Sequence, residues 1–204
     1  MGIVRLGAAL ALCTIAGTAG AECLSAADLG RGVVARFENG DFTVMRRQAD
    51  GYLTIEENYV DGTPPTRFRA HRGIYFVAEG ESDGNGGIVP GTGLEVVFEV
   101  DPARLPEPLP GVAWEGPTVN VFDDGSTRNE VMSVHFSAAP PLTLSGCDYE
   151  VIRAEIRYDW GPDGGAELTY LYLPEVTTAV ILSNQFDGDD LFTTTPVGLE
   201  RHSK

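Results

Sequence analysis

Apolar and polar residues alternate with a period of two along most of this chain, and this alternation is typical of half-buried β-strands. In residues 93–100, "GLEVVFEV", one face carries Leu94, Val96, Phe98 and Val100, and the other carries Glu95 and Glu99. Residues 129–137, "NEVMSVHFS", place Met132, Val134 and Phe136 on one face. Residues 52–60, "YLTIEENYV", also alternate, although Glu57 interrupts the pattern. Residues 178–186, "TAVILSNQF", are more continuously apolar and predict a strand buried on both faces.

Turn-forming residues separate these runs at intervals of about ten residues. Asn39-Gly40 in "ENGD" predicts a two-residue hairpin, and "ADGY" and "VDGTPP" continue the series. Short turns between strands favour antiparallel neighbours. The first half therefore predicts a meander with strands at residues 32–38, 41–48, 52–60, 66–71 and 73–79.

Residues 101–117 contain five prolines, which argue against a central strand and predict an extended crossover. Residues 24–30, "LSAADLG", predict one short N-terminal helix that Ser25 could cap and Gly30 could end. The expected fold is all-β and mainly antiparallel, with about ten strands. A curved half-barrel and two packed β-meanders both satisfy this pattern.

The N-terminus has the features of a secretory signal peptide. Arg5 supplies a positive charge, residues 6–15 are apolar, and residues 19–21 read small-x-small. We therefore expect residues 1–21 to be removed and the mature protein to be periplasmic or secreted. Residues 22–204 are expected to form a single β domain, divisible into meander halves at 32–100 and 118–195 that the crossover 101–117 joins.

The composition is strongly acidic, with 14 basic and 30 acidic residues and a net charge of −16. Such a charge argues against nucleic acid and anionic lipid as partners. No segment after the signal peptide is apolar for long enough to predict a membrane span. The mature chain would keep two cysteines, Cys23 and Cys147, which in an oxidising compartment predict one disulfide bond. The alternative is two unpaired buried thiols.

No local motif of a hydrolase nucleophile, a metalloprotease, a redox dithiol or a phosphate loop is present. We therefore expect no catalytic residue, no metal site and no cofactor; this pattern favours a protein that is not an enzyme but leaves enzymatic activity open. Asp159, Asp163 and Glu167 in "IRYDWGPDGGAELTYLYLPE" could bind calcium, but their spacing is more typical of a solvated turn. Thirty acidic residues leave carboxylate-pair chemistry open as an alternative.

Two groups of side chains are candidate ligand contacts. The first is an aromatic face on the second half of the chain, and plain core packing is its alternative: Trp160, Leu168, Tyr170 and Tyr172. The second is a basic face in "TRFRAHR", formed by Arg67, Arg69 and His71, which could hold a carboxylate or phosphate. Cross-strand ion pairs with Glu38, Glu56 and Glu57 are the alternative for this basic face.

Residues 145–175, "SGCDYEVIRAEIRYDWGPDGGAELTYLYLPE", resemble a strand–turn–strand pattern of uncharacterised exported β-rich proteins of proteobacteria. The pattern is also similar to half-barrel proteins of the lipoprotein-carrier type. The resemblance implies an antiparallel β fold and an envelope location, and it assigns no site residue. The leading hypothesis is a non-enzymatic binding or carrier module for a hydrophobic or lipid-like small molecule. The alternatives are an envelope component that contacts another protein through exposed strand edges, and a hydrolase of cell-wall or carbohydrate substrates.

Overall fold

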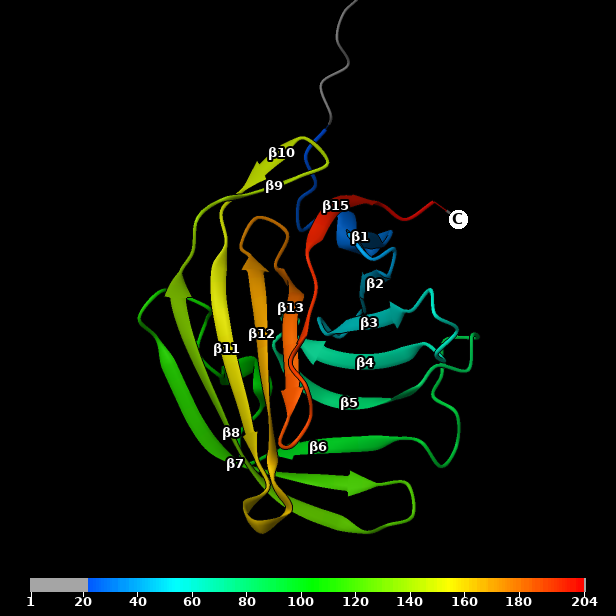
Figure 1. Ribbon diagram of the computed structural model, residues 1–204, viewed down its shortest axis with the longest axis vertical. Helices are drawn as coiled ribbons and strands as arrows, with labels where there is room; N and C mark the ends of the chain where they lie inside the picture. Colours follow the sequence, from blue (N-terminus) through cyan, green and yellow to red (C-terminus); the bar gives the residue numbers. More distant parts are fainter. Residues whose placement is uncertain (1–21, 204) are drawn as a thin grey trace, which may run out of the picture.

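The computed structural model describes residues 22–203, and they form one antiparallel sheet of 13 strands together with a separate two-stranded hairpin (Figure 1). The signal peptide predicted at residues 1–21 lies outside the described residues. The strands are β1 (Val33–Phe37), β2 (Phe42–Arg47), β3 (Leu53–Asn58), β4 (Thr66–His71), β5 (Tyr75–Glu81), β6 (Leu94–Phe98), β7 (Ala113–Phe122), β8 (Thr127–Ala138), β9 (Leu142–Leu144), β10 (Cys147–Tyr149), β11 (Ile152–Asp159), β12 (Gly165–Leu173), β13 (Thr178–Phe186), β14 (Phe192–Thr193) and β15 (Pro196–Arg201).

The spatial order of the large sheet is β14-β13-β12-β11-β8-β7-β6-β5-β4-β3-β2-β1-β15, and every pairing in it is antiparallel. The sheet is continuous but does not close on itself. It bends so that β11, β12 and β13 stand across the interior from β3, β4 and β5 (Figure 1). The all-β, antiparallel prediction is confirmed, although residues 22–203 form 15 strands instead of about ten, of which β9, β10 and β14 have only two or three residues each.

The meander predicted for the first half is confirmed within two residues at each strand end. The hairpin at Asn39-Gly40 differs in detail, because its loop has three residues instead of two. The Phe37 N–H donates to the carbonyl of Asp41 at 3.0 Å, which leaves residues 38–40 as the loop. Gly40 occupies the left-handed region with φ +95°, and this conformation allows the chain to reverse there.

The short helix predicted at residues 24–30 is wrong. Only a 3-10 turn of three residues, Asp28–Gly30, is present. The Asp28 carboxylate accepts hydrogen bonds from the Ser25 N–H at 2.9 Å and its hydroxyl at 3.3 Å, so Ser25 caps no helix. A seven-residue helix is also too short to be stable without extensive packing. None of the helical turns in residues 22–203 is long and apolar enough to cross a membrane.

The predicted crossover is shorter than residues 101–117, because β7 begins at Ala113 and includes Pro117. Proline is tolerated here because β6 pairs with β7 only from Thr118 to Phe122, which leaves Pro117 with β8 as its one neighbouring strand. The division of residues 22–204 into one domain with two meander halves stays a prediction.

The C-terminal segment links the two edges of the sheet. Thr193 in β14 pairs with Ser183 in β13, and the Thr194 N–H donates to the Leu182 carbonyl at 2.8 Å. Two residues later the chain pairs with β1 instead, as β15. Residues 192–201 therefore satisfy backbone groups at both edges, and they hold the two walls of the sheet together.

The hydrophobic core fills one part of the interior. Along β8, Met132, Val134 and Phe136 point inward and are fully or almost fully buried. They belong to one buried cluster that also includes Leu53, Tyr75, Ile156 and Leu173, from β3, β5, β11 and β12. Closer to the start of β8, the inward residues are Arg128 and Glu130, and these line a cavity instead of packing in the core.

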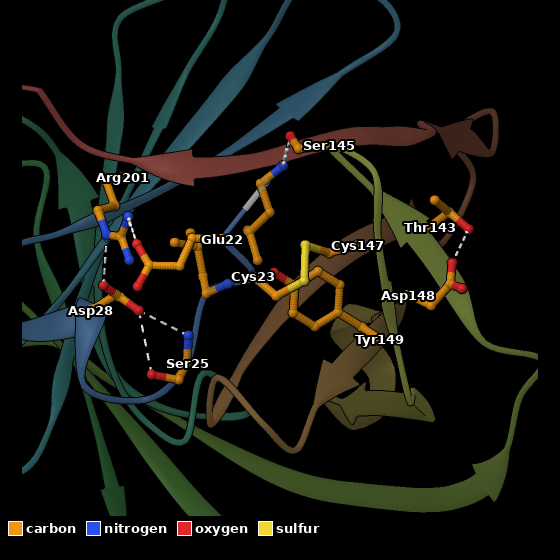
Figure 2. The surroundings of a disulfide bond; sticks show 12 residues. Glu22, Cys23, Ser25, Asp28, Thr143, Ser145, Cys147, Asp148, Tyr149 and Arg201 are labelled. Atoms are coloured by element: carbon orange, nitrogen blue, oxygen red, sulfur yellow. Dashed lines mark hydrogen bonds and ion pairs between the residues drawn. A yellow bond between two sulfur atoms is a disulfide. The ribbon is translucent and has the colours of Figure 1, made fainter. Parts of the chain in front are cut away.

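The predicted disulfide bond joins Cys23 and Cys147, 124 residues apart in the sequence (Figure 2). Around it, the Leu24 N–H donates to the Tyr149 hydroxyl at 2.9 Å, and Arg201 pairs with Glu22 at 2.9 Å and with Asp28 at 2.8 Å. The bond attaches the start of the described chain to the β9–β10 hairpin. That hairpin contacts β15 in turn, because Ser145 Oγ accepts a hydrogen bond from the Leu199 N–H at 3.0 Å. A disulfide of this kind is consistent with an exported protein.

We expect the Cys23→Ser, Cys147→Ser double variant to be less stable than the wild type by about 4–5 kcal/mol, since the bond closes a loop of more than a hundred residues in the unfolded chain. Urea unfolding of the oxidised wild type and the variant measures this difference. Unfolded, unreduced wild-type protein should also contain no free thiol. Equal stability, or two titratable thiols, would contradict the role assigned to the bond.

Candidate functional site

An interior cavity of about 340 Å³ lies between the two walls of the sheet. Strands β3 to β8 and β11 to β13 all contribute side chains to it. Most of its wall is apolar or aromatic, and includes Phe68, Phe76, Leu94, Val96, Ile181 and Phe186. Phe186 is 48% exposed, so the cavity reaches solvent at this end of β13. Its volume falls within the ~300–1,000 Å³ range of small-molecule sites.

A larger hollow of about 750 Å³ lies on the outer face of β7, β8 and β11 to β13, but it is a weaker candidate. Both of its arginines already have partners on the same surface. Arg157 pairs with Glu167 at 2.9 Å, and Arg153 pairs with Glu155 at 3.0 Å. Exposed, paired charges of this kind are typical of a solvated sheet face.

Sheets usually turn apolar side chains inward and polar side chains outward, but around β7 and β8 this distribution is reversed at the cavity. Val97 on neighbouring β6 is 50% exposed on the outer face, and Val131 on β8 is 44% exposed there. The inward positions are polar instead: Thr118 lies opposite Glu130, and Asn120 lies opposite Arg128. Because alternation fixes which side chains share a face, these four polar residues form one cluster inside the protein.

Glu130 is the centre of this cluster and is only 5% exposed. Its carboxylate accepts hydrogen bonds from Thr118 Oγ1 at 2.6 Å, from Asn120 Nδ2 at 3.1 Å and from Trp160 Nε1 at 2.7 Å. Three donors satisfy a buried carboxylate well. The arrangement also fixes the Trp160 ring at the edge of the cavity, where it stacks on Phe186 with ring centroids 6.2 Å apart.

Arg128 lies beside the cluster without an ion-pair partner. Its guanidinium lies 4.0 Å from the centroid of the Trp160 ring and 5.5 Å from that of Phe122, both cation–π contacts. Among residues 22–203, no side chain forms a hydrogen bond or ion pair with it, and its Nε is buried without an acceptor. Asn120, which is 2% exposed, likewise keeps Oδ1 without a donor. The polar end of the cavity therefore has unused hydrogen-bonding capacity.

Two more carboxyl groups line the cavity, and both are shifted toward the neutral form. Burial raises the pKa of Glu57 above its ordinary value, although a hydrogen bond from the Tyr59 hydroxyl at 2.9 Å opposes the shift and the charge of Glu79 adds to it. Burial also raises the pKa of Glu79, which the charge of Glu130 reinforces and Arg128 opposes. No basic side chain in the described part of the chain forms a salt bridge with either group.

Tyr158 and Tyr170 complete the polar lining. Burial raises the pKa of each hydroxyl well above 10.0, so both stay protonated at physiological pH. Neither hydroxyl has a hydrogen-bond partner among residues 22–203. The ring of Tyr170 packs against Phe76 with centroids 5.8 Å apart, so its aromatic face forms part of the wall.

The structure brings together three of the four residues predicted to form the aromatic face. Trp160, Leu168 and Tyr170 all line the cavity. Tyr172 is 7% exposed and lies opposite Ile152 and Ala179, farther along β12 and among core residues. Its placement corresponds to the core-packing alternative.

The predicted basic face lies on the outside of the sheet, away from the cavity. Arg67 pairs with Glu56 at 2.9 Å, and Arg69 pairs with Asp50 at 2.7 Å and covers the Tyr52 ring. His71 packs edge-on against Tyr52 with centroids 5.7 Å apart. Burial and the charge of Arg72 lower its pKa, so His71 tends to be neutral. A ligand role for these three residues stays a prediction.

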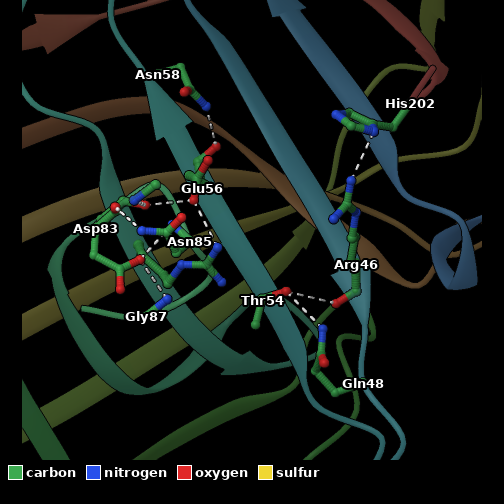
Figure 3. A network of polar contacts seen from close by, with 12 residues as sticks. Arg46, Gln48, Thr54, Glu56, Asn58, Asp83, Asn85, Gly87 and His202 are labelled. Carbon is green, nitrogen blue, oxygen red and sulfur yellow. Dashed lines mark hydrogen bonds and ion pairs between the residues drawn. The ribbon is translucent and has the colours of Figure 1, made fainter. Parts of the chain in front are cut away.

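Figure 3 shows the polar network around Glu56 and Arg46 on the same outer face. Glu56 accepts hydrogen bonds from both Arg67 and the Ser82 hydroxyl, at 2.9 and 2.8 Å. Arg46 Nη2 lies 2.9 Å from His202 Nδ1, which ties the last described residues to β2. The Arg67–Glu56 pair therefore agrees with the alternative that the basic face forms cross-strand ion pairs. Glu57, the neighbouring candidate partner, points into the cavity instead.

The acidic turn between β11 and β12 is mainly structural. Asp159 accepts a hydrogen bond from the Gly161 N–H at 2.8 Å, Asp163 lies in a 3-10 turn, and Glu167 pairs with Arg157. Within residues 22–203, no group of three or more His, Cys, Asp or Glu side chains is arranged to hold a metal ion.

The polar residues of the cavity were missed from the sequence, although two of them carry a usable signal. Glu130 is separated by an even number of positions from Met132, Val134 and Phe136, so it shares their face of the strand. Glu57 is related in the same way to Leu53, Ile55 and Tyr59. Continuing each alternation by two residues would have placed both carboxylates inside. Glu79 carries no such signal, because a bulge in β5 changes its face: Ala70 pairs with Phe76, but Arg69 pairs with Ala78.

Comparison with known proteins gives one structural similarity. No family model matches the chain, and no curated protein matches it. A crystal structure of the hypothetical lipoprotein YmcC from Escherichia coli (K12) superposes with a TM-score of 0.42 at 14% sequence identity, covering 75% of this chain and 77% of that one.

We expect the carboxyl groups of Glu57 and Glu79 to make stability fall as pH rises. Each has a folded-state pKa above the ordinary value of 4.5, so between the two values the folded protein binds more protons than the unfolded chain. Stability is therefore lost as pH rises through that window. The Glu57→Gln, Glu79→Gln double variant lacks this term, so its stability should exceed that of the wild type near neutral pH and depend less on pH.

Urea unfolding midpoints between about pH 4 and pH 8 measure the effect. Glu95→Gln is the matched control, because Glu95 is exposed on the outer face of β6 and forms no ion pair among the described residues. A double variant whose pH profile parallels those of the wild type and the control would show that the two carboxyls are not desolvated.

Proposed function

We propose that this protein is an exported, non-enzymatic binding or carrier module that holds a small amphipathic molecule in its interior cavity. The observation that carries the proposal is the cavity itself: about 340 Å³ lined on most sides by aromatic and aliphatic side chains, with polar groups concentrated at defined positions. A sheet that only had to be stable would fill this space with its own side chains.

The polar lining supports a binding role over a packing defect. An empty cavity in a stable core is normally apolar, because unpaired buried polar groups are costly. Here Asn120 Oδ1 and Arg128 Nε have no partner among the described residues, and Glu79 forms no hydrogen bond with any of them. Retaining such groups around a cavity is typical of a site whose partner comes from outside the chain.

The proposed location is the periplasm or the extracellular medium. The signal peptide expected at residues 1–21 and the Cys23–Cys147 bond both support it. The proposed architecture is a half-barrel, in which a curved sheet partly surrounds its ligand. A carrier protein of this shape can shield an apolar molecule from water during transport.

A hydrolase is the second candidate, because three carboxyl groups, Glu57, Glu79 and Glu130, line one cavity and burial raises the pKa of Glu79. A protonated acid beside a carboxylate is the pairing that glycoside hydrolysis needs. Against this, the Glu130 carboxylate already accepts three hydrogen bonds from the protein. Release of chromophore from chromogenic glycosides that stops in Glu79→Gln would favour the hydrolase.

An interaction role through exposed strand edges has less support. One edge of the large sheet is β14, which has only two residues, and the other is β15, which the β9–β10 hairpin contacts. Short or covered edges offer little backbone for strand addition.

Binding in the cavity predicts that a bulky side chain on its wall blocks uptake of a neutral fluorescent probe. Val96 on β6 lines the cavity, whereas the next residue, Val97, is 50% exposed on the outer face. N-phenyl-1-naphthylamine should show saturable fluorescence enhancement with the wild type. Val96→Trp should weaken its binding by about tenfold or more, because the indole occupies the site.

Val97→Trp is the control and should bind the probe as the wild type does, since its indole points to solvent. Equal binding by both variants would place the probe on the surface. Absence of any saturable enhancement in the wild type would contradict the proposed function.

A further inference from the structure

The charges that surround the cavity are unbalanced, and this imbalance restricts what can occupy it. Three carboxyl groups face the cavity, from Glu57, Glu79 and Glu130, against the single guanidinium of Arg128. Glu130 is satisfied by three donors of the protein. Glu57 has one donor, the Tyr59 hydroxyl at 2.9 Å, and Glu79 has none among residues 22–203. These two groups have hydrogen-bonding and charge capacity left for an occupant.

We propose that the occupant carries an organic ammonium group, which the carboxylates of Glu57 and Glu79 hold against the aromatic wall; this inference rests on the binding function proposed above. Ammonium N–H groups are donors only, and the carboxylates of Glu57 and Glu79 and the Asn120 Oδ1 atom, which has no donor among the described residues, are acceptors that line the cavity. An ammonium ion thus supplies both the donors and the counter-charge that this part of the cavity lacks.

The positions of the two carboxyl groups suit a single cation between them. Glu57 on β3 lies opposite Thr66, and Glu79 on β5 lies opposite Phe68, so the two flank the same strand, β4, on the inward face. The charge of Glu79 raises the pKa of Glu57, and the charge of Glu130 raises the pKa of Glu79, as expected for carboxyl groups that face one cavity. A cation between them would remove that repulsion.

Aromatic rings supply the remaining walls. Tyr158 and Tyr170 line the cavity opposite β3 to β5, with Phe68 and Phe76 on the facing side. The negative face of an aromatic ring attracts cations, and a desolvated site strengthens this attraction. Aromatic walls combined with carboxylates are a recurrent way to bind amines, whereas they offer nothing to a carboxylate or phosphate.

Arg128 does not convert the cavity into an anion site. Its guanidinium stacks on Trp160 at 4.0 Å and forms no salt bridge among the described residues, and its charge opposes only part of the upward shift that burial and Glu130 impose on the pKa of Glu79. An anionic head group would meet two further carboxyl groups in the same cavity. The whole chain, with a net charge of −16, also attracts cations and repels anions at long range.

The test compares ligands that share one apolar chain and differ in the head group. Decylammonium, decyltrimethylammonium, decanol and decanoate are titrated into the mature wild-type protein, with binding followed by calorimetry and by displacement of N-phenyl-1-naphthylamine. Decylammonium should bind at least about tenfold more tightly than decanol, because charge-assisted hydrogen bonds are stronger than neutral ones. Decanoate should be the weakest ligand.

Glu57→Gln and Glu79→Gln should each reduce the affinity for decylammonium to near that for decanol and leave decanol itself unchanged within about twofold. Glu95→Gln, with the same change on the outer face of β6, should behave as the wild type. Preference for the amine should also disappear as pH is lowered, because protonated carboxyl groups carry no charge. The other titratable groups that face this site, or act on it through their charge, are Asp41, Tyr59, Arg128, Glu130, Tyr158 and Tyr170.

The outcomes separate the two proposals. If decanol or decanoate binds as tightly as decylammonium, or if the preference survives in both Gln variants, the ammonium inference is wrong and the binding function stands. If no member of the series binds and the probe is not taken up, the binding function itself is wrong.

Discussion

An open antiparallel sheet has two edges whose backbone groups need partners, and the chain meets this constraint with one segment. Residues 192–201 form the two edge strands, β14 and β15, and pair first with β13 and then with β1, at opposite ends of the sheet. To reach both, the sheet must bend until its walls face each other (Figure 1). The disulfide-linked N-terminus and the β9–β10 hairpin lie beside β15 at one end of the sheet (Figures 1 and 2). An enclosed interior is therefore a direct result of how the edges are satisfied.

The interior that results is filled unevenly. Along β8 the inward residues change from Phe136, Val134 and Met132, which pack in the core, to Glu130 and Arg128, which do not. The Glu130 carboxylate then organises its surroundings, since its three donors come from β7 and from Trp160 after β11. Core packing supplies the stability, and the polar, partly unsatisfied part of the interior is the part that we propose binds a ligand.

Period-two alternation was enough to predict most strands and the shared face of Leu168, Tyr170 and Tyr172, whereas Trp160 lies in the turn after β11, where alternation does not apply. It failed where the backbone departs from regular pleating. The bulge in β5 brings Glu79 to the inner face, and the end of β6 makes Pro117 tolerable within β7; neither follows from residue types alone. Alternation also could not distinguish Tyr170 from Tyr172, because both side chains point inward. Only the residues on the facing wall determine that Tyr170 lines the cavity and Tyr172 packs in the core.

The most direct test of this account is native mass spectrometry of the mature protein purified from the cells that produce it. The account predicts a population heavier than the polypeptide by the mass of one small molecule, released on denaturation, present in Val97→Trp and absent in Val96→Trp. A wild-type spectrum that contains only the bare polypeptide under conditions that preserve the fold, with no adduct after incubation with decylammonium, would contradict the claim that the cavity is a binding site.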